Sequence, residues 1–454
     1  MTDLLARTAF AAYRGAGMPL LPFVDLLLER RTRRGKEDPL RRGERKGWSS
    51  CERPDGPLVW VHAASVGETM SVLPLIDWLA GSGLSVVLTT GTVTSATLAA
   101  RRLPRGAIHQ YVPLDLPLFI NRFLDHWQPV AALFVESEIW PTTLGELHRR
   151  RIPHALVNAR ISERSMASWL KVRPIARALF GRFSLVLAQS AEDAARFERI
   201  GASDVVMTGN IKFDCKPLGA DQTELEALRR LIGARPILLA ASTHPGEEAL
   251  VTEAALKIAK SLPDLLTIIV PRHPDRRTDI MAELEATGCQ PAARSRGEIP
   301  GPETDIYLAD TLGELGLFYR LADVAFVGGS LVPIGGHNPI EAAQLDIAVL
   351  HGPHVYNARD IFAALDEGGG ARLVRDANEL AEHALRLLSM PTLARDSARA
   401  GREIVESGRG ALEQTRHWLA TRLLPDYLPK VGQTTLDDSR SEIQSGDVVE
   451  RVAG

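Results

Sequence analysis

The chain has 454 residues, of which 45% are apolar, and its formal charge at neutral pH is -3. A single hydrophobic core stops growing at about 250 to 300 residues, so this length predicts a globular protein of two domains. The near-neutral charge argues against a protein that coats nucleic acid, and we expect no nucleic-acid partner. The three cysteines are widely spaced and form no Cys-x-x-Cys pair, so neither a disulfide framework nor a zinc site is predicted.

The N-terminal segment, residues 1–50, joins an apolar stretch to a basic run. The stretch Met18–Leu28 is interrupted by two prolines and an aspartate, and it is far shorter than the roughly 20 residues that span a bilayer. This order is typical of a segment that lies among the headgroups of an anionic leaflet. A buried first helix followed by a solvated charged loop explains it equally well. The basic residues are Arg30, Arg31, Arg33, Arg34, Lys36, Arg41, Arg42, Arg45 and Lys46.

Short apolar runs begin after Gly56 and recur through the first half of the chain. Stretches of helix length separate them, and this alternation predicts a parallel sheet covered by helices on both faces. We assign this sheet to a first domain of residues 51–215. The predicted strands are Leu58–Ala63, Ser85–Thr90, Val130–Glu136, His154–Ala159 and Leu185–Ser190.

A second series of apolar runs predicts another domain of the same architecture over residues 236–425. The polar stretch 216–235 is predicted to be the linker between the two domains, and the polar residues 426–454 a disordered tail. Two doubly wound, Rossmann-like α/β domains would bring the carboxyl ends of both sheets to a central cleft, where such sheets bind ligands. The predicted strands are Pro236–Ser242, Leu266–Arg272, Asp305–Asp310, Val324–Gly329 and Ile347–Gly352.

The turn after the first predicted strand reads HAASVGET and holds Glu68 near the start of the next helix. Small residues such as Gly67 let the backbone approach a ligand closely. A carboxylate at this end of a parallel sheet can take a proton from an attacking sugar hydroxyl. A glutamate in the first turn of a helix also complements the helix dipole, and the pattern alone favours neither role.

Other polar residues follow later strands of the first domain. Glu136 and Glu138 in ESEIWP would share one face if the strand continued that far, and paired carboxylates at a sheet edge are costly unless they bind something. A solvated loop is the alternative. The segment NARISERS offers Asn158, Arg160 and Ser162, and GNIKFD offers Lys212, whose cationic group can face the cleft or simply lie in solvent.

The second domain offers three segments that can bind an anion. ASTHPGEE, residues 241–248, is a small-residue turn that opens a helix, so its backbone N–H groups are predicted to receive an anion. PRHP supplies Arg272 and His273. The glycine-rich GGSLVPIGGHNPIEAA, residues 328–343, predicts a nucleotide grip in which backbone amides hold phosphate and Glu341 binds ribose hydroxyls. It is neither a Walker A loop nor a dinucleotide fingerprint.

Seven motifs, in this order, resemble the 3-deoxy-D-manno-octulosonic acid (Kdo) transferase family of lipopolysaccharide biosynthesis. The family implies a GT-B fold, the donor CMP-Kdo, the acceptor lipid IVA, and attachment to anionic lipids at the cytoplasmic face of the inner membrane. It also implies that the first domain binds the acceptor and the second the CMP-sugar. The motifs are HAASVGE, ESEIWP, NARIS, GNIKFD, PRHPDR, GGSLVPIGGHNPIEAA and GPHVYNARD.

The same resemblance implies roles for individual residues. Glu68 matches the family's catalytic base, and Glu138 and Lys212 match positions that stabilise the transition state. The segments matched to CMP binding comprise Pro271, Arg272, Gly313, Glu314, Leu315, Asn338, Pro339, Ile340 and Glu341.

We expect no metal or other cofactor, because CMP carries one phosphate and the sequence has no Asp-x-Asp triplet of the kind that chelates a divalent ion. Cations and helix N-termini can stabilise the leaving phosphate instead. A nucleotide-sugar epimerase of the same fold would share the grip and an acidic base, but it would not need the basic N-terminal segment. A non-catalytic membrane-bound scaffold would need neither Glu68 nor the nucleotide motifs.

Overall fold

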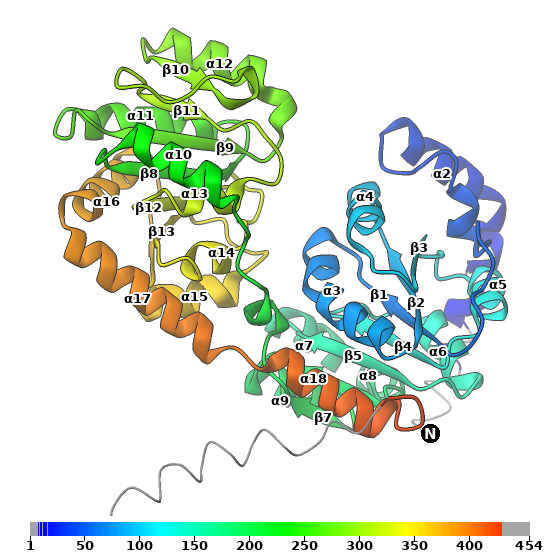
Figure 1. The fold of residues 1–454 in the computed structure, drawn as a ribbon. Coiled ribbons are helices and arrows are strands. Elements are labelled where there is room, and N and C mark those ends of the chain that lie inside the picture. Colours follow the sequence, from blue (N-terminus) through cyan, green and yellow to red (C-terminus); the bar gives the residue numbers. More distant parts are fainter. Residues whose placement is uncertain (1–7, 9, 11, 16, 429–454) are drawn as a thin grey trace, which may run out of the picture. The chain divides into compact units, whose positions relative to one another are not determined.

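The computed structural model describes residues 8, 10, 12–15 and 17–428. It divides into two compact units, shown in Figure 1: residues up to Cys215 together with those from Arg409 onward form the first, and Lys216–Gly408 form the second. Each unit contains one parallel sheet of seven strands with helices between successive strands, so the doubly wound α/β architecture is confirmed.

The sheet of the first unit has the strand order β3-β2-β1-β4-β5-β6-β7 and is parallel throughout. All five strands predicted for this domain are present, shortened by up to two residues. Its two edge strands, β3 and β7, were not predicted. The strands are β1 Leu58–His62, β2 Ser85–Thr90, β3 Ala107–Tyr111, β4 Ala131–Val135, β5 His154–Ala159, β6 Leu185–Ala188 and β7 Val205–Met207.

Helices cover both faces of this sheet, and most begin directly after a strand. They are η1 Met18–Phe23, α2 Val24–Arg33, η2 Arg42–Lys46, α3 Val66–Gly81, α4 Val93–Arg102, α5 Pro117–Trp127, α6 Pro141–Arg149, α7 Glu163–Leu170, α8 Arg173–Phe180, α9 Ala191–Ile200, η3 Ile211–Asp214, α18 Ala411–Trp418 and η6 Leu419–Leu423.

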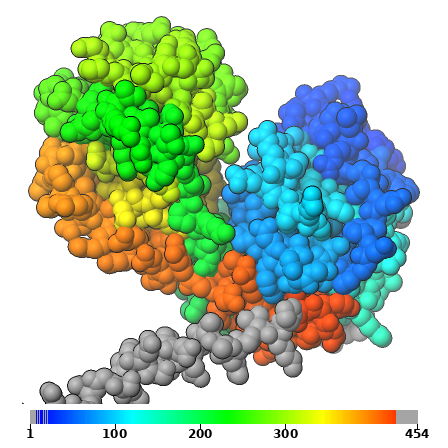
Figure 2. All heavy atoms as spheres, viewed as in Figure 1, coloured from blue at the N-terminus to red at the C-terminus, as the bar shows by residue number. Residues whose placement is uncertain are grey.

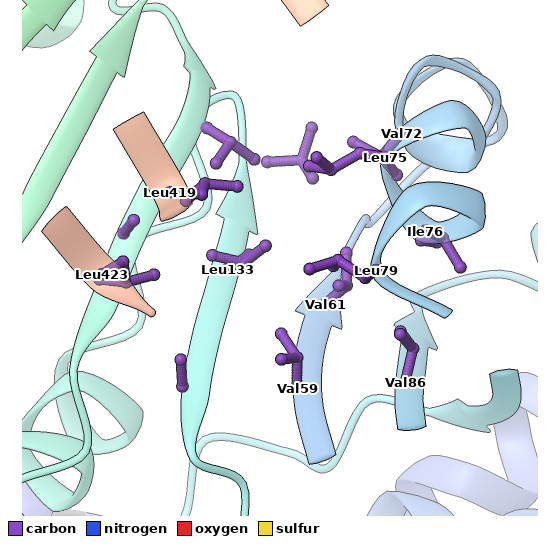
Figure 3. Close-up of a cluster of buried hydrophobic side chains, with 14 of the residues drawn as sticks. Val59, Val61, Val72, Leu75, Ile76, Leu79, Val86, Leu133, Leu419 and Leu423 are labelled. Carbon is purple, nitrogen blue, oxygen red and sulfur yellow. The ribbon is translucent and has the colours of Figure 1, made fainter. Parts of the chain in front are cut away.

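Two cores sandwich the first sheet because strand residues alternate between its faces. In β1, Val59 and Val61 point into one core, and Leu58 and Trp60 point into the other. Figure 3 shows the first of these cores, where the β1 valines meet Leu133 and the apolar side of α3. Burying each such side chain contributes about 1.5 to 3 kcal/mol, so the sheet is firmly held and its carboxyl edge is a rigid base for a site.

The C-terminal helices return to the first unit. Leu419 and Leu423 of η6 lie in the same core as β1 (Figure 3), and Figure 2 shows the orange-red segment that carries them against the blue atoms of this unit. The Asp214 carboxylate accepts hydrogen bonds of 2.7 Å from the backbone N–H groups of Gly410 and Leu412, at the start of α18. The structure thus differs from the predicted boundary at residue 425, because the helices after Gly408 complete the first core. Apart from residues 426–428, the predicted disordered tail lies outside the described residues.

The N-terminal segment is a folded part of the first unit. Val24 and Leu28 of α2 pack against Phe119 of α5. Much of the basic run forms internal ion pairs: buried Arg45 donates to Glu37 and to two backbone carbonyls. Among the described residues, the basic side chains of this run without a hydrogen bond or ion pair are Arg30, Arg34 and Lys36. None of the helices in the described ranges is long and apolar enough to cross a membrane.

The sheet of the second unit has the order β10-β11-β9-β8-β12-β13-β14 and is also parallel. Its five inner strands were predicted and its two edge strands were not. Residues 216–235 are more than a linker, because they contain a helix of the second unit, α10. The strands are β8 Ile237–Thr243, β9 Leu266–Pro271, β10 Pro291–Ala293, β11 Ile306–Leu308, β12 Val324–Val327, β13 Ala348–His351 and β14 Ala371–Leu373.

The helices of the second unit are shown in green, yellow and orange in Figure 1. They are α10 Gln222–Ile232, α11 Glu247–Ala259, η4 Pro274–Arg276, α12 Arg277–Ala286, η5 Arg294–Arg296, α13 Leu315–Tyr319, α14 Ile340–Ala343, α15 Arg359–Glu367, α16 Ala377–Ser389 and α17 Pro391–Ser407.

Candidate functional site

The carboxyl edge of the first sheet carries several ionisable side chains that come from different elements. We call them the carboxylate cluster: His62, Glu68, Glu136, Glu138 and Lys212. His62 ends β1, Glu68 lies in the first turn of α3, the other two glutamates follow β4, and Lys212 lies in η3. Parallel strands bring their carboxyl ends to one edge, so residues far apart in sequence can combine there.

Glu68 belongs to the cap of α3. Ser65 is the N-cap residue, and its hydroxyl accepts a hydrogen bond from the Glu68 N–H. The Glu68 carboxylate in turn accepts 2.8 Å hydrogen bonds from the Ser65 hydroxyl and from the Ala64 N–H, a variant of the capping box. Burial, with the nearby charge of Glu136, raises the pKa of this half-buried carboxyl, and the two hydrogen bonds only partly offset that rise. The side chain therefore caps a helix and is also a more basic carboxylate than usual.

Glu136 is paired with a lysine. Strand β4 ends at Val135, and Glu136 adopts a left-handed φ of 58° that turns its side chain off the strand line. Its carboxylate accepts a hydrogen bond of 2.6 Å from the Lys212 ammonium, and the Arg160 guanidinium lies 3.9 Å away. The condition for a shared face of Glu136 and Glu138 is not met, because strand β4 ends before either of them. Lys212 contacts Glu136 rather than Glu138.

Glu138 has a different environment. Its carboxylate accepts a hydrogen bond of 2.8 Å from the Trp140 indole N–H, and the imidazole Nε2 of His62 lies 3.3 Å from the same oxygen. Burial raises the pKa of the Glu138 carboxyl, but the contacts with His62 and Trp140 outweigh it and hold this pKa below its usual value. Glu138 is therefore a fixed negative charge at neutral pH.

His62 joins this group through a hydrogen-bonded chain that sequence patterns did not indicate. The Trp60 indole N–H donates to the Thr89 hydroxyl at 2.8 Å, and that oxygen lies 3.0 Å from Nδ1 of the buried His62. Nδ1 also lies 3.1 Å from the Thr89 carbonyl oxygen, so both ring nitrogens of His62 have hydrogen-bond partners, and Nε2 donates to the Glu138 carboxylate. A histidine at the last position of a buried strand was the one signal for this role.

The segment NARISERS serves the fold more than the cluster. Asn158 is buried, adopts a φ of 50°, and its side-chain oxygen accepts from the Ile211 N–H at 3.1 Å. Ser162 is the N-cap of α7 and accepts from the Ser165 N–H. Arg160 alone faces a site residue, through its 3.9 Å contact with Glu136.

In the second unit, two of the three predicted anion-binding segments bind an anion that belongs to the chain. The buried Glu247 carboxylate accepts hydrogen bonds of 2.7 to 3.0 Å from four backbone N–H groups. One lies in the ASTHPGEE turn and three lie in the glycine-rich loop. The prediction that these amides hold a substrate phosphate is therefore wrong for these four, because a glutamate of α11 already occupies them. They are those of His244, Gly329, Ser330 and Leu331.

Arg272 and Glu341 lie near each other at this sheet edge. Arg272 follows Pro271, the last residue of β9, and across the described ranges its half-buried guanidinium has no hydrogen bond or ion pair. Burial raises the pKa of the Glu341 carboxyl to about 7, and the charge of Arg272 limits that rise. Asn338 accepts from the Ile340 N–H at 3.2 Å and orders the turn before α14, with Pro339 at its N-cap. An arginine without a partner and a carboxyl that titrates near pH 7 suit a nucleotide.

The Gly313-Glu314-Leu315 turn is held by an arginine. Gly313 has a φ of +88°, which favours glycine. The Glu314 carboxylate accepts two hydrogen bonds from Arg294 and one from the Thr311 hydroxyl, and Leu315 then begins α13. The Glu314 side chain is thus engaged within the unit and orders this turn.

No group of three or more histidine, cysteine or acidic side chains that could hold a metal ion occurs in the described part of the chain. Cys51, Cys215 and Cys289, all within the described ranges, form no disulfide.

The fold is that of the two-domain GT-B class, as comparison with solved structures shows. A glycosyltransferase from Rickettsia africae has a TM-score of 0.56 at 14% identity and covers 82% of this chain and 99% of its own. A putative UDP-N-acetylglucosamine 2-epimerase from Listeria monocytogenes has a TM-score of 0.53 at 14% identity and covers 81% of this chain and 96% of its own. At such identities the likeness defines the fold and leaves the activity open.

Sequence comparison defines the family. Residues 40–215 match the family model described as 3-deoxy-D-manno-octulosonic-acid transferase. The 3-deoxy-D-manno-octulosonic acid transferase of Bordetella pertussis is 37% identical over 413 residues, which cover 87% of this chain and 95% of that protein. The chain therefore belongs to the Kdo transferase family of glycosyltransferases, as the seven motifs predicted.

Proposed function

We propose that the protein transfers Kdo from CMP-Kdo to lipid IVA with inversion at the anomeric carbon. Membership of the Kdo transferase family supports the transferred sugar. The observation that carries the mechanism is Glu68, a carboxylate of raised pKa at the carboxyl edge of the first sheet. General bases work best when their pKa lies near the working pH, and this carboxyl is shifted in that direction.

The reaction is a single displacement. Glu68 takes the proton of the acceptor hydroxyl while that oxygen forms a bond to the anomeric carbon of Kdo. The bond from this carbon to the phosphate oxygen of CMP breaks, and its electron pair stays on the phosphate. Among the carboxylates of the cluster, Glu136 is bound by Lys212, and Glu138 by His62 and Trp140. Glu68 has only neutral hydrogen-bond donors, which makes it the carboxylate best able to accept a proton.

The second unit would hold the donor. Arg272 can bind the phosphate, because its guanidinium has no protein partner within the described residues. Glu341 would bind ribose hydroxyls, and its pKa of about 7 would let it donate or accept a hydrogen bond. Positive side chains would then stabilise the leaving phosphate.

Membrane attachment at the cytoplasmic face of the inner membrane would rest on α2 and the residue before it. Phe23, Leu26 and Leu27 are 62%, 69% and 49% exposed. Arg30, Arg34 and Lys36 follow them and can contact anionic headgroups at about 1 kcal/mol each. The rest of the basic run is engaged in ion pairs, so the surface is smaller than the sequence suggested and favours peripheral binding to anionic lipids.

The rival function is a nucleotide-sugar epimerase, which shares the fold. Incubation of the purified protein with CMP-Kdo and lipid IVA, followed by mass spectrometry, separates the two. We expect the lipid mass to rise by one or more Kdo units and CMP to be released, and the product mass gives the number added. Thermal stabilisation by UDP-N-acetylglucosamine that exceeds stabilisation by CMP, with no change in lipid mass, would contradict the proposal.

A further inference from the structure

Three histidines gather at the carboxyl edge of the second sheet. His244 follows β8, His273 follows β9, and His337 lies in the glycine-rich loop after β12. We call them the histidine cluster. The Nε2 atoms of His244 and His337 are 2.9 Å apart and their rings are almost parallel, with an angle of 7° between them. The ring of His273 stands edge-on to that of His244, with 5.7 Å between centroids.

The glycine-rich loop is shaped around this pair. Gly329 has a φ of +68°, and a Cβ placed there would lie 3.1 Å from an atom of the His337 ring and 3.4 Å from one of the His244 ring. The Glu247 carboxylate fixes the loop by accepting from the N–H groups of Gly329 and His244. The same carboxylate therefore positions both sides of the pair, and a side chain at residue 329 would press on both rings.

Two facing Nε2 atoms at this distance share a single proton. One more proton can be added on the outer Nδ1 side, so the pair can carry one positive charge and still keep its N–H···N hydrogen bond. Two charges would set two N–H groups against each other. The pair is thus built to hold either no charge or one.

The surroundings keep the pair neutral when no anion is bound. Burial and the neighbouring His244, Arg272 and His273 lower the pKa of His337 to about 4. Burial, His273 and Arg272 likewise lower the pKa of His244. The nearby acidic groups oppose this shift weakly, because Glu247 is bound by backbone N–H groups and Glu248 by Arg276. Among the described residues, the charged and titratable groups next to the pair include Glu247, Glu248, Arg272, His273 and Arg276.

We propose that the His244–His337 pair, together with Arg272, binds the phosphate monoester of CMP and takes up one proton when it does so. This inference rests on the proposed function and deepens it. The phosphate of CMP-Kdo is a diester with one negative charge. When the bond to Kdo breaks, its electron pair stays on the phosphate oxygen, and the resulting monoester carries close to two charges above its second pKa of about 6.

The proton that the pair takes up comes from water and matches that extra charge. The proton of the acceptor hydroxyl goes to Glu68 and is not needed here. A site whose positive charge rises as the phosphate gains negative charge binds the leaving group better than the donor. Such differential binding favours bond cleavage.

Proton uptake is measured by titrating the full-length protein with CMP calorimetrically at pH 7.5, in two buffers of different ionisation enthalpy. We expect uptake of about one proton for the wild type. Because binding raises the pKa of the pair above its value in the free protein, the proton's contribution to CMP affinity is full only below the free-state pKa and is lost as the pH rises to the bound-state pKa. Above the second pKa of CMP, affinity should therefore fall by up to about tenfold per pH unit as the pH rises toward the bound-state pKa, and it should level off above it. Cytidine, which lacks the phosphate, should bind without proton uptake.

Single substitutions test which residues are responsible for the proton uptake. His337→Gln and His244→Gln should each remove most of the uptake and weaken CMP binding by about tenfold, and cytidine binding should not change. His383→Gln, on α16, is the matched control and should behave as the wild type. Wild-type CMP binding without proton uptake, uptake that survives both substitutions, or equal weakening of cytidine would each overturn the proposal.

Inorganic phosphate distinguishes failure of this inference from failure of the proposed donor. If phosphate binds with proton uptake that depends on His244 and His337 while CMP does not bind, the phosphate site is supported and CMP-Kdo is contradicted as the donor. If CMP binds without proton uptake, the proposed donor is supported and the proton-linked role of the histidine pair is contradicted. If neither ligand binds, both are wrong.

Discussion

The two sheet edges handle charge in opposite ways. In the first unit negative groups gather, and each except Glu68 has a cationic or imidazole partner. In the second unit the buried carboxylates Glu247 and Glu248 are satisfied inside the unit, and positive and imidazole groups remain at the edge. Among the described residues, the group available to a ligand at each edge is therefore the one that the fold leaves without an ion pair. In the first unit that group is Glu68, and in the second it is Arg272.

The largest expected effect is that of Glu68→Gln. Glutamine keeps the oxygen that accepts from the Ala64 N–H, so the cap of α3 should persist. Loss of the base should lower turnover by roughly two to four orders of magnitude, with CMP binding unchanged. Turnover measured beside a melting curve checks this.

A role confined to the helix cap predicts the reverse pattern, with up to about 1 kcal/mol of lost stability and nearly normal turnover. That result would mean that another carboxylate is the general base. Glu138→Gln should be measured in parallel, because neighbouring carboxylates can exchange apparent roles.

Two arginines of the second unit differ in whether they have an acidic partner. Arg272→Gln should weaken CMP binding by roughly 10- to 150-fold, the loss of a charge-assisted hydrogen bond of about 1.5 to 3 kcal/mol, and leave stability nearly unchanged. Arg276→Gln should instead cost about 3 to 5 kcal/mol of stability, because it leaves buried Glu248 without its partner. Calorimetric CMP titration and denaturant unfolding of both variants test this. Equal effects of the two on CMP binding would show that pairing does not decide which arginine meets the ligand.

The smallest expected effect concerns His62, a positioning residue. His62→Leu removes the donor to Glu138, so the lowered pKa of that carboxyl should rise toward its usual value. The carboxylate is the charged form above its pKa, so the acid limb of the kcat profile should move to higher pH. The loss at the optimum should be about 2- to 12-fold, as for one hydrogen bond of 0.5 to 1.5 kcal/mol.

His62→Gln, which can still donate to Glu138, should restore most of the wild-type profile. An unchanged acid limb in His62→Leu would mean that the histidine serves only the packing at the end of β1.

The inner strands of both sheets were predicted from sequence, and all four edge strands were missed. An inner strand of a parallel sheet is buried on both faces and reads as a continuous apolar run. The edge strand β7, Val205–Met207, has three residues, none of them buried, and β14, Ala371–Leu373, has only one buried residue. Edge strands this short and exposed leave no such pattern, and backbone pairing with a neighbour defines them instead.

The motifs named individual residues of the candidate site but could not predict the contacts between them. The motifs located Glu68, Glu138 and Lys212, yet Lys212 binds Glu136, a pairing across 76 positions that no local pattern encodes. Glu247 was missed because a glutamate at a helix start is ordinarily exposed. Only the fold shows that four backbone N–H groups converge on it. Sequence can thus name the side chains at a sheet edge, but not the partners that decide which of them remain available.

The return of α18 and η6 to the first unit has a consequence for biosynthesis. Leu419 and Leu423 fill the core beside Val59 and Leu133, but the ribosome translates them only after the whole of the second unit. The first unit therefore emerges with α3 already on this face of the sheet, but with the part that α18 and η6 cover still open until the second unit, Lys216–Gly408, has been translated. During this interval the nascent chain exposes the apolar residues of that part, and we expect chaperones at the ribosome exit to bind them.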